Sequence, residues 1–383
     1  MSAETTHPFE YSPYPSTLYI AFELGQKHWK LGFTIGFGQH PRERTIPARD
    51  VARLREEVRQ AQKRFRLPAT VRMLSCYEAG RDGFWLHRYL HSVGIENLVV
   101  DSASLEVKRR KRRVKTDRVD LGKLLRMLIR FDLGERQVWS VVRVPTPEAE
   151  DRRQLHRELA TLKAERTRHT NRIKGLLAGQ GVYLSVKKAF PEQLQAVRTW
   201  DSTELPPGLQ ARLMREYARI QLLNHQIAEL EEQRTAALLT SARPEIQQVR
   251  QLMRLKGIGP NYAWLYVMEF FSWRAFRNRR ELAALAGLTP TPQQSGQSEQ
   301  ERGISKAGNR HIRSLAIEMA WSWLRNQPDS QLAHWYQRRF AQGSKRIRKI
   351  GIVALARRLL IELWRFLETG AIPEGAVLKN RPI

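Results

Sequence analysis

The sequence predicts an α/β domain at the N-terminus, followed by regions that are entirely helical. Up to residue 147, short β-rich runs alternate with helical segments, which is the pattern of a layered α/β domain. From Glu148, apolar side chains recur on a heptad lattice over two long stretches. From about Pro244, apolar helical segments alternate with turns that contain glycine and proline. We therefore expect three domains, 1–147, 148–243 and 244–383.

The elements of the first domain follow from period and composition. The runs TLYIAFELG and HWKLGFTIG predict a hairpin, because both are rich in strand-forming residues and a short polar turn separates them. The other elements alternate in kind. We expect helices over 51–65, 84–94 and 115–131, strands over 71–78 and 96–102, and a closing extended run over 138–145.

The second domain is expected to consist of two long helices. One heptad lattice runs from Leu155 to Leu176, and a second runs from Leu213 to Leu230. A less regular stretch with the breaker PPG separates them. An antiparallel helical arm and a dimerising coiled coil both fit this pattern, and so does a role limited to packing.

The third domain opens with LKGIGP, in which Gly257 and Gly259 stand between two apolar helical segments. This pattern resembles a helix-hairpin-helix element, whose glycines let backbone N–H groups approach phosphate oxygens. An ordinary helix–helix turn is the alternative. Further helices are expected over 308–326 and 348–368, and the second is apolar enough to pack in a core.

Charge is the most informative bulk property of the chain. The 383 residues include 66 Lys and Arg against 38 Asp and Glu, a formal net charge of +28. A polyanion relieves the self-repulsion of such an excess, and nucleic acid is the usual one, although a ribosome-associated factor would share the property. The single Cys76 excludes an internal disulfide, and no apolar run suggests a signal peptide or a membrane span. We expect a cytoplasmic protein with no membrane partner.

Four carboxylates stand in the order strand, strand, helix. Glu23 lies on the first strand, Glu78 ends the strand VRMLSCYE, and Asp117 and Asp120 open a helix three residues apart. This order fits an RNase H-like domain. Clustered carboxylates repel one another and attract a cation, and oxygen ligands favour Mg²⁺ or Mn²⁺. Helix capping is the alternative for the aspartate pair, and a surface position is the alternative for Glu78.

A run of cations precedes the aspartate pair. Because six consecutive cations are hard to bury, they must be solvated or bound to phosphate. Their place before an acidic pair predicts a nucleic-acid channel that leads to a metal site, with a solvated loop as the alternative. The cations are Lys108, Arg109, Arg110, Lys111, Arg112 and Arg113, followed by Lys115 and Arg118.

Ser295 precedes a glycine in a stretch that predicts a polar loop, where serine is usually a turn residue, and Ser298 is nearby. A serine attacks only when something eases its deprotonation and stabilises the charge that develops. Downstream cations could stabilise that charge on a phosphodiester. The residues that we expect to bind nucleic acid here are Lys306, Asn309, Arg310 and Arg313.

Four segments taken together resemble one family. CYEAGRDGFWLHRYL, KTDRVD, LKGIGP and AGLTPTPQQSG…GISKAGNRHIR are similar to segments of the insertion-sequence transposases of the IS-one-ten family, including its IS-eleven-eleven branch. The resemblance covers nearly the whole chain. It implies a DNA recombinase with a RuvC-like N-terminal domain that carries an Asp-Glu-Asp-Asp tetrad, a coiled-coil arm, and a C-terminal transposase domain with a nucleophilic serine.

The resemblance also assigns residues and partners. Glu78, Asp117 and Asp120 match the second, third and fourth acids, and Ser295 matches the serine of the SG motif. Glu23 stands where the family usually has aspartate, and its side chain reaches about one carbon farther. The resemblance further implies a structured bridge RNA that guides recombination of donor and target DNA. It implies a homodimer or homotetramer whose protomers share the two half-sites, and a bacterial protein associated with the nucleoid.

The predicted function is therefore transposition by a Mg²⁺-dependent acidic site and a serine nucleophile. One rival is a metal-only RuvC-like nuclease, such as a junction resolvase, which would use the four acids and leave Ser295 as a turn residue. A second rival is a non-catalytic nucleic-acid-binding protein, whose carboxylates would only cap helices. An SDS-stable protein–DNA species would separate serine chemistry from both rivals.

Overall fold

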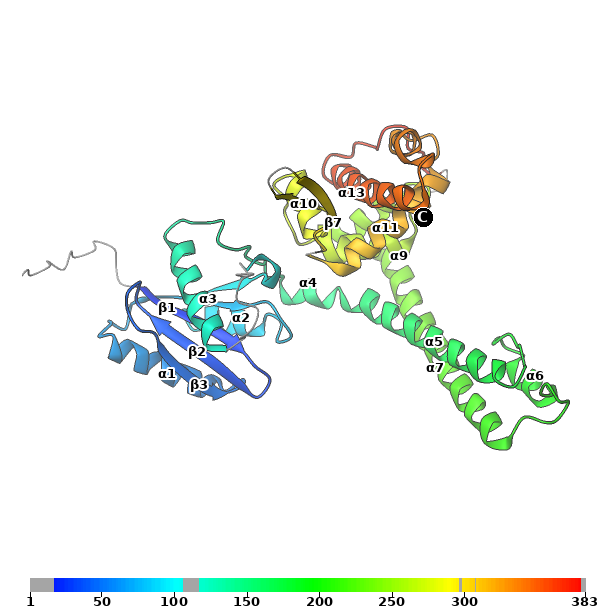
Figure 1. The fold of residues 1–383 in the computed structure, drawn as a ribbon, viewed down its shortest axis with the longest axis horizontal. Helices are drawn as coiled ribbons and strands as arrows, with labels where there is room; N and C mark the ends of the chain where they lie inside the picture. Colours follow the sequence, from blue (N-terminus) through cyan, green and yellow to red (C-terminus); the bar gives the residue numbers. More distant parts are fainter. Residues whose placement is uncertain (1–16, 106–116, 296–297, 307, 380–383) are drawn as a thin grey trace, which may run out of the picture. The chain divides into compact units, whose positions relative to one another are not determined.

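The chain divides into two compact units, Met1–Val144 and Pro145–Ile383. The structure is a computed structural model, and it describes residues 17–105, 117–295, 298–306 and 308–379. Figure 1 shows the chain coloured from the N-terminus in blue to the C-terminus in red. The division into three domains that the sequence suggests stays a prediction.

A five-stranded mixed sheet forms the centre of the N-terminal unit. Its strands are β1 (Thr17–Leu24), β2 (His28–Thr34), β3 (Arg42–Pro47), β4 (Arg72–Glu78) and β5 (Glu96–Val100). They lie in the order β3-β2-β1-β4-β5, and only β2 runs against its neighbours. The predicted hairpin and both predicted strands are confirmed. β3 was not expected, and the run over 138–145 contributes an isolated bridge between Val100 and Val141.

Helices cover both faces of this sheet. α1 (Val51–Arg64) and α2 (Trp85–Ser92) share an apolar cluster with Phe22 and Tyr77, and α3 (Asp117–Asp132) shares a second cluster with Ala21 and Cys76. The two clusters alternate along β1 and β4, because successive side chains of a strand point to opposite faces. The predicted helices over 51–65, 84–94 and 115–131 are confirmed to within a few residues.

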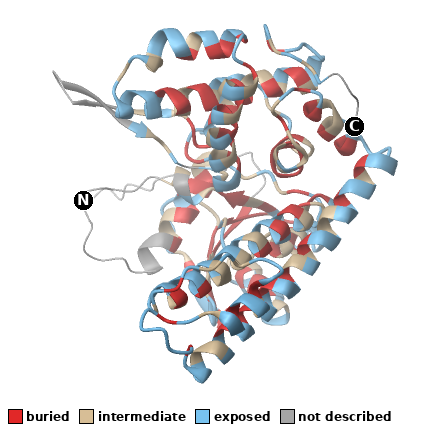
Figure 2. Cartoon of the chain, turned by 90° about the vertical axis from the view of Figure 1, so that its right-hand side faces the viewer, coloured by how far each residue is buried: buried red, intermediate tan, exposed pale blue. Residues whose placement is uncertain are grey.

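Two long helices of the C-terminal unit pack side by side (Figure 1). α5 (Gln154–Ala178) and α7 (Pro207–Thr240) run antiparallel, because Lys163 pairs with Glu231 and Arg172, further along α5, pairs with Glu216. The short α4 (Pro147–Asp151) precedes them, and α6 (Phe190–Ala196) lies between them in sequence. Their buried residues follow one side of each helix (Figure 2). The two predicted helices are thus present, as an antiparallel pair within one chain that we call the helical arm.

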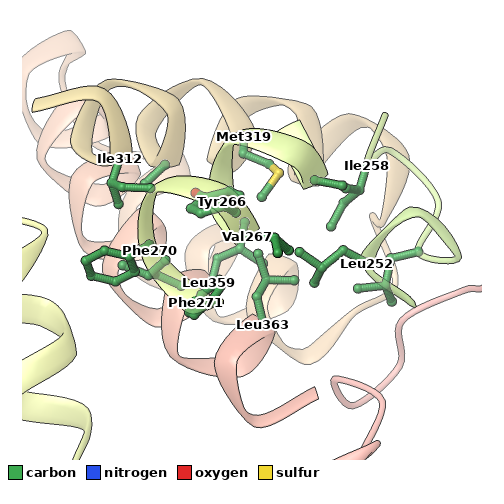
Figure 3. Packing of buried hydrophobic residues seen from close by; sticks show 14 of the residues in the cluster. Leu252, Ile258, Tyr266, Val267, Phe270, Phe271, Ile312, Met319, Leu359 and Leu363 are labelled. Atoms are coloured by element: carbon green, nitrogen blue, oxygen red, sulfur yellow. The ribbon is translucent and has the colours of Figure 1, made fainter. Parts of the chain in front are cut away.

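The rest of the C-terminal unit is a helical core with one hairpin. Its helices are α8 (Pro244–Met253), α9 (Pro260–Tyr266), α10 (Arg279–Leu285), α11 (Arg310–Asn326), α12 (Gln331–Tyr336) and α13 (Lys345–Thr369), with π-helical turns η2 (Val267–Phe271) and η3 (Gln337–Ala341). Figure 3 shows side chains of these elements, among them Tyr266, Met319 and Leu363, interdigitating in the core. The predicted helices over 308–326 and 348–368 correspond to α11 and α13.

The hairpin corrects two predictions. β6 (Pro290–Ser295) and β7 (Ser298–Ile304) pair antiparallel where a polar loop was expected, so this region is not entirely helical. The segment lacks the apolar alternation that marks a strand. Its strands form because backbone groups pair with each other, and such pairing does not require apolar side chains.

No helix in the part of the chain that the structure describes has the length and apolar character to cross a membrane.

Candidate functional site

The first candidate site lies at one edge of the five-stranded sheet. β1 and β4 are parallel neighbours whose register pairs Phe22 with Tyr77. Glu23 follows the first of these residues and Glu78 follows the second, so the two glutamates occupy adjacent positions where both strands approach their ends. Neighbouring strands are about 4.8 Å apart, which brings the two residues within reach of one ion.

Both glutamates face the same side of the sheet. Phe22 and Tyr77 belong to the apolar cluster beneath α1 and α2. Since side chains alternate along a strand, Glu23 and Glu78 point to the opposite face, which α3 covers. Glu23 is half-buried and Glu78 is exposed, so this end of the sheet is open to solvent.

The direction of α3 places its first turn at this same edge. Near the C-terminal end of the helix, Tyr19 at the start of β1 donates a hydrogen bond of 2.9 Å to Asp132. Nearer the N-terminal end, Leu121 and Leu125 press on β2, where a Cβ added to Gly32 would lie 3.0 Å from each of them. The helix therefore runs antiparallel to β1 and begins beside the end of β1.

The structure thus brings together part of the predicted set of metal-binding carboxylates. The backbones of Asp117 and Asp120 belong to the first turn of α3, at the edge that carries Glu23 and Glu78. The side chains of the two aspartates lie outside the described part of the molecule. Among the side chains that are described, no group of three or more His, Cys, Asp or Glu could hold a metal ion. The complete set of four ligands stays a prediction.

Most residues of the predicted basic channel lie outside the part of the chain that the structure describes. The run from Lys108 to Arg113 and the following Lys115 lie beyond the described residues. Arg118 belongs to the first turn of α3, and its side chain is likewise not described. Lys30, on β2, is paired in register with Glu23 and lines a shallow pocket with Glu43 and Leu121 on the face that α3 covers. Arg44 points to the other face of the sheet, where it forms an ion pair of 3.7 Å with Glu57 of α1. Lys30 therefore brings positive charge to the face that carries Glu23 and Glu78.

Of the two glycines that suggested a phosphate-binding turn, Gly257 has a structural role in the core. Gly257 has a φ of +89°, and a Cβ added there would lie 2.7 Å from the Cβ of Asn326 on α11. The hydroxyl of Ser322 donates a hydrogen bond of 3.2 Å to the Gly257 carbonyl. Gly259 is the residue that precedes α9. Close packing and a positive φ together explain why residue 257 is glycine, and the phosphate-binding role stays a prediction.

The two candidate serines flank the tip of the hairpin. Ser295 ends β6, Ser298 begins β7, and the register pairs them. Residues 296–297 and the side chains of both serines lie outside the described part of the structure. The choice between the serines therefore stays a prediction.

The segment after the hairpin divides the predicted nucleic-acid-binding residues into two kinds. Asn309 caps α11, and its side-chain oxygen accepts hydrogen bonds from two backbone N–H groups of the first turn. Arg313 donates a hydrogen bond of 2.9 Å to the carbonyl of Lys306, whose φ is +55°. These contacts shape the segment. The side chains of Lys306 and Arg310 are exposed, as phosphate contacts require.

Glu269 is a buried charged residue that the sequence reasoning missed. It lies in the π-helical turn η2, and its side chain has no solvent exposure. Its carboxylate accepts hydrogen bonds from His156 at 2.8 Å, from Arg157 at 2.5 and 2.9 Å, and from the Asn309 amide at 3.3 Å. The first two donors belong to the helical arm, and the third caps α11. Glu269 therefore ties the arm to the segment that follows the serine hairpin.

The ionisation state of the Glu269 carboxyl follows from the groups around it. Burial by itself raises the pKa of Glu269, but hydrogen bonds from His156 and Arg157 and the charge of Arg157 outweigh burial, and the pKa lies far below its usual range. Glu269 is thus ionised at neutral pH. A glutamate inside the apolar run VMEFF was the available signal, since a buried charge requires partners.

Comparisons with known proteins identify relatives of this chain. The family model described as "Transposase IS116/IS110/IS902 family" matches residues 249–336. The Sinorhizobium fredii chain y4rJ, which carries a transposase description, is 41% identical over 376 residues, which are 95% of this chain and 95% of that protein.

More distant relatives have the same description. The transposase for insertion sequence element IS1328 of Yersinia enterocolitica is 26% identical over 232 residues, covering 59% of this chain and 66% of that protein. The transposase for IS1111A of Coxiella burnetii is 28% identical over 196 residues, covering 51% of this chain and 52% of that protein. The class that emerges is the insertion-sequence transposase, an enzyme that cuts and rejoins DNA. Within that class, the chain belongs to the IS116/IS110/IS902 family.

Proposed function

We propose that this transposase acts through two half-sites of different chemistry. One is a Mg²⁺-binding acidic edge on an RNase H-like domain, and the other is Ser295 at the tip of the hairpin β6–β7. The observation that carries the first half is the shared sheet edge of Glu23, Glu78 and the first turn of α3. The strand order β3-β2-β1-β4-β5, with only β2 reversed, supports the RNase H-like assignment.

The acidic edge fits Mg²⁺ or Mn²⁺ because the candidate donors are all carboxylate oxygens. Glu23, Glu78, Asp117 and Asp120 would hold the ion. A bound ion would lower the cost of charge development on phosphate oxygens. Pairing of Glu23 with Lys30 in the register of β1 and β2 fixes the position from which its longer side chain starts.

The serine half-site accounts for strand exchange through a transient link. The Ser295 hydroxyl oxygen attacks a DNA phosphorus, a new O–P bond forms, and the bond from phosphorus to one sugar oxygen breaks. The serine proton leaves with that sugar oxygen, so the step is balanced without an oxidant or a cofactor. Family membership supports this role, and a hairpin tip supports it sterically, since a tip can reach a duplex.

Replacement of the serine tests the second half-site. We expect a Ser295→Ala variant to bind DNA normally but to form no SDS-stable protein–DNA species and to give no excision. Ser298→Ala is the matched control, because the two serines are paired across the same hairpin tip. If Ser295→Ala keeps the adduct and Ser298→Ala loses it, the nucleophile is Ser298. If both variants recombine DNA at the wild-type rate, the serine mechanism is wrong.

Replacement of an acid tests the first half-site. We expect Asp117→Asn and Glu78→Gln to lose DNA cleavage in Mg²⁺ while DNA binding and folding persist. Glu204→Gln is the control, since the Glu204 side chain is 80% exposed in the segment between α6 and α7. If Asp117→Asn cleaves DNA normally, the carboxylates serve as helix caps and the acidic site is refuted.

The proposed partners can be tested on the same protein. We propose that a structured bridge RNA guides recombination of donor and target DNA, and the strongly basic chain is consistent with such a partner. RNA that co-purifies with the protein should be one discrete species, and random fragments would contradict the guide. We further propose an oligomer whose half-sites come from different protomers. Mixing Ser295→Ala with Asp117→Asn chains should then restore activity, whereas a single-chain site would stay inactive in the mixture.

A further inference from the structure

A strongly positive surface that has no role in the proposed function lies around the start of α13. Between Asp329 and Glu362 the chain has no acidic residue but has eight Lys and Arg. Six of these cations lie on η3 or on the first turns of α13, and all six are exposed. They are Arg338, Arg339, Lys345, Arg346, Arg348 and Lys349. Within the described residues, no carboxylate pairs with any of them.

The side chains at the start of α13 are exposed to solvent. Every residue from Lys345 to Ile350 is exposed, and burial begins at Gly351. Six residues of helix span about 9 Å, which is nearly two turns. The sequence predicts that this apolar helix packs, and that prediction is correct only from Gly351 onward. The charged turns before it form a projecting tip.

The charges on this tip are arranged by face. At about 100° per residue, Lys345, Arg346, Arg348 and Lys349 fall within an arc of about 160°. We call these four residues the basic tip. Ile347 and Ile350 lie on the other side of the helix, and Ile347 faces the preceding turn, where a Cβ added to Gly343 would come within 2.8 Å of its Cβ. The cations therefore point away from that turn, and Ile347 points back toward it.

The elements before the tip hold it in a fixed place. α12 and η3 lead into a turn of three residues, Gln342 to Ser344, and α13 follows. A Cβ added to Gly351 would overlap the ring of Phe340, so η3 and α13 cross in close contact. The Tyr336 hydroxyl also donates a hydrogen bond of 3.3 Å to the Arg348 carbonyl. The unit is two helical segments joined by a short turn that contains glycine, and the second segment presents the basic tip.

We propose that α12, η3 and the start of α13 form a helix-turn-helix element whose basic tip enters the major groove of double-stranded DNA. A helix with its side chains is about 10–12 Å wide, which matches a B-form major groove of about 12 Å. Arg346 and Arg348, at the two ends of the charged arc, face the phosphates on either side, and Lys345 and Lys349 face the groove floor. Duplex RNA does not offer this fit, because its major groove is too deep and narrow for side chains to read.

Salt dependence of binding tests the charge contacts. Each phosphate contact contributes about −0.9 to the slope of log K against log salt. Arg346 and Arg348 face phosphates, so a variant with all four residues of the basic tip changed to Gln should lose about 2 from the slope measured with a DNA duplex. The control changes four exposed cations elsewhere in the C-terminal unit, Lys174, Lys188, Arg212 and Arg215, to Gln, which alters the net charge equally. An equal loss in the control would overturn the proposal, because binding would then follow net charge.

Two further measurements test whether the partner is duplex DNA and whether the basic tip enters its major groove. With an RNA duplex of the same sequence, the tip variant should bind as the wild type does, and an equal loss for DNA and RNA would overturn the choice of DNA. Wild-type protein should protect guanine N7, which lies in the major groove, from dimethyl sulfate, and the tip variant should not. Absence of protection in the wild type would refute groove entry. Thermal melting of both variants shows whether folding is intact, and neither readout depends on the metal or serine chemistry.

Discussion

Replacing Glu269 with glutamine should weaken the C-terminal unit more than any surface change of the same kind. The carboxylate has no solvent exposure and accepts hydrogen bonds from His156, Arg157 and Asn309. Glutamine has nearly the same shape, so it leaves no cavity. It removes the charge and turns one acceptor into a donor that faces donors. The donors that bonded to the replaced oxygen then lose their acceptor inside the protein, which carries the main cost.

The magnitude follows from the exposure of the partners. Removing one member of a buried ion pair costs about 3 to 5 kcal/mol, and we take the lower end because the Arg157 side chain is 42% exposed and can be solvated. For a unit of this size, a loss of about 3 kcal/mol lowers the melting temperature by about 6 to 12 °C. Calorimetry of the full chain should show this shift in the transition of the C-terminal unit.

The matched control is Glu362→Gln on α13. Glu362 pairs with Arg365 at 2.9 Å, but the two side chains are 30% and 51% exposed, so the pair contributes about 0 to 1 kcal/mol. Glu269→Gln should also speed amide exchange around Asn309, because the contact that joins the cap of α11 to η2 is weakened. A fall in melting temperature of less than about 2 °C, or a fall equal to that of the control, would refute the claim that Glu269 ties the arm to this segment.

Three other predictions concern backbone packing and pH. Gly32→Val should destabilise the N-terminal unit by about 1 to 3 kcal/mol in urea unfolding, since Leu121 already lies 3.0 Å from an added Cβ, and Gly32→Ala should cost less. Gly308→Ala should cost at least about 2 kcal/mol by the same assay, because φ is +102° and the new Cβ would lie 2.2 Å from the Leu285 carbonyl oxygen; unchanged stability would contradict that geometry. The pKa of Glu269 is lowered in the folded state, so its contribution is complete above the unfolded value of about 4.3 and declines as the pH falls below it. The stability gap between wild type and Glu269→Gln should therefore narrow in urea titrations from pH 5 toward about pH 3, and a constant gap would contradict the lowered pKa.

The predictions about individual elements succeeded where local pattern and tertiary packing agree. The runs around Ile20 and Leu31 predicted the hairpin of β1 and β2, because both are rich in strand-forming residues and a short polar turn separates them. The heptad lattices predicted α5 and α7, because one side of each helix is buried. The run that forms β6 and β7 carries neither pattern, so the sequence predicts a loop there.

The candidate sites divide in the same way. Residue order alone suggested that Glu23 and Glu78 would meet, because parallel strands bring their carboxyl ends to one edge. Nothing local indicated that Glu269 would meet His156 and Asn309, since these residues are 113 and 40 positions away from it along the chain. The motif around Gly257 suggested a phosphate-binding glycine. The close approach of Asn326 explains the glycine by packing instead.

The amino-acid sequence was sufficient to predict the class of elements, the excess of positive charge, the family of transposases and the chemistry that each candidate residue can perform. These properties depend on composition and on periods of two to seven residues, which a linear chain displays directly. Packing in three dimensions was needed to show that α3 starts beside the two glutamates, that Glu269 joins the arm to the cap of α11, and that the side chains on the first turns of α13 are exposed. Those facts depend on which distant segments share a buried surface, and packing in three dimensions selects that surface.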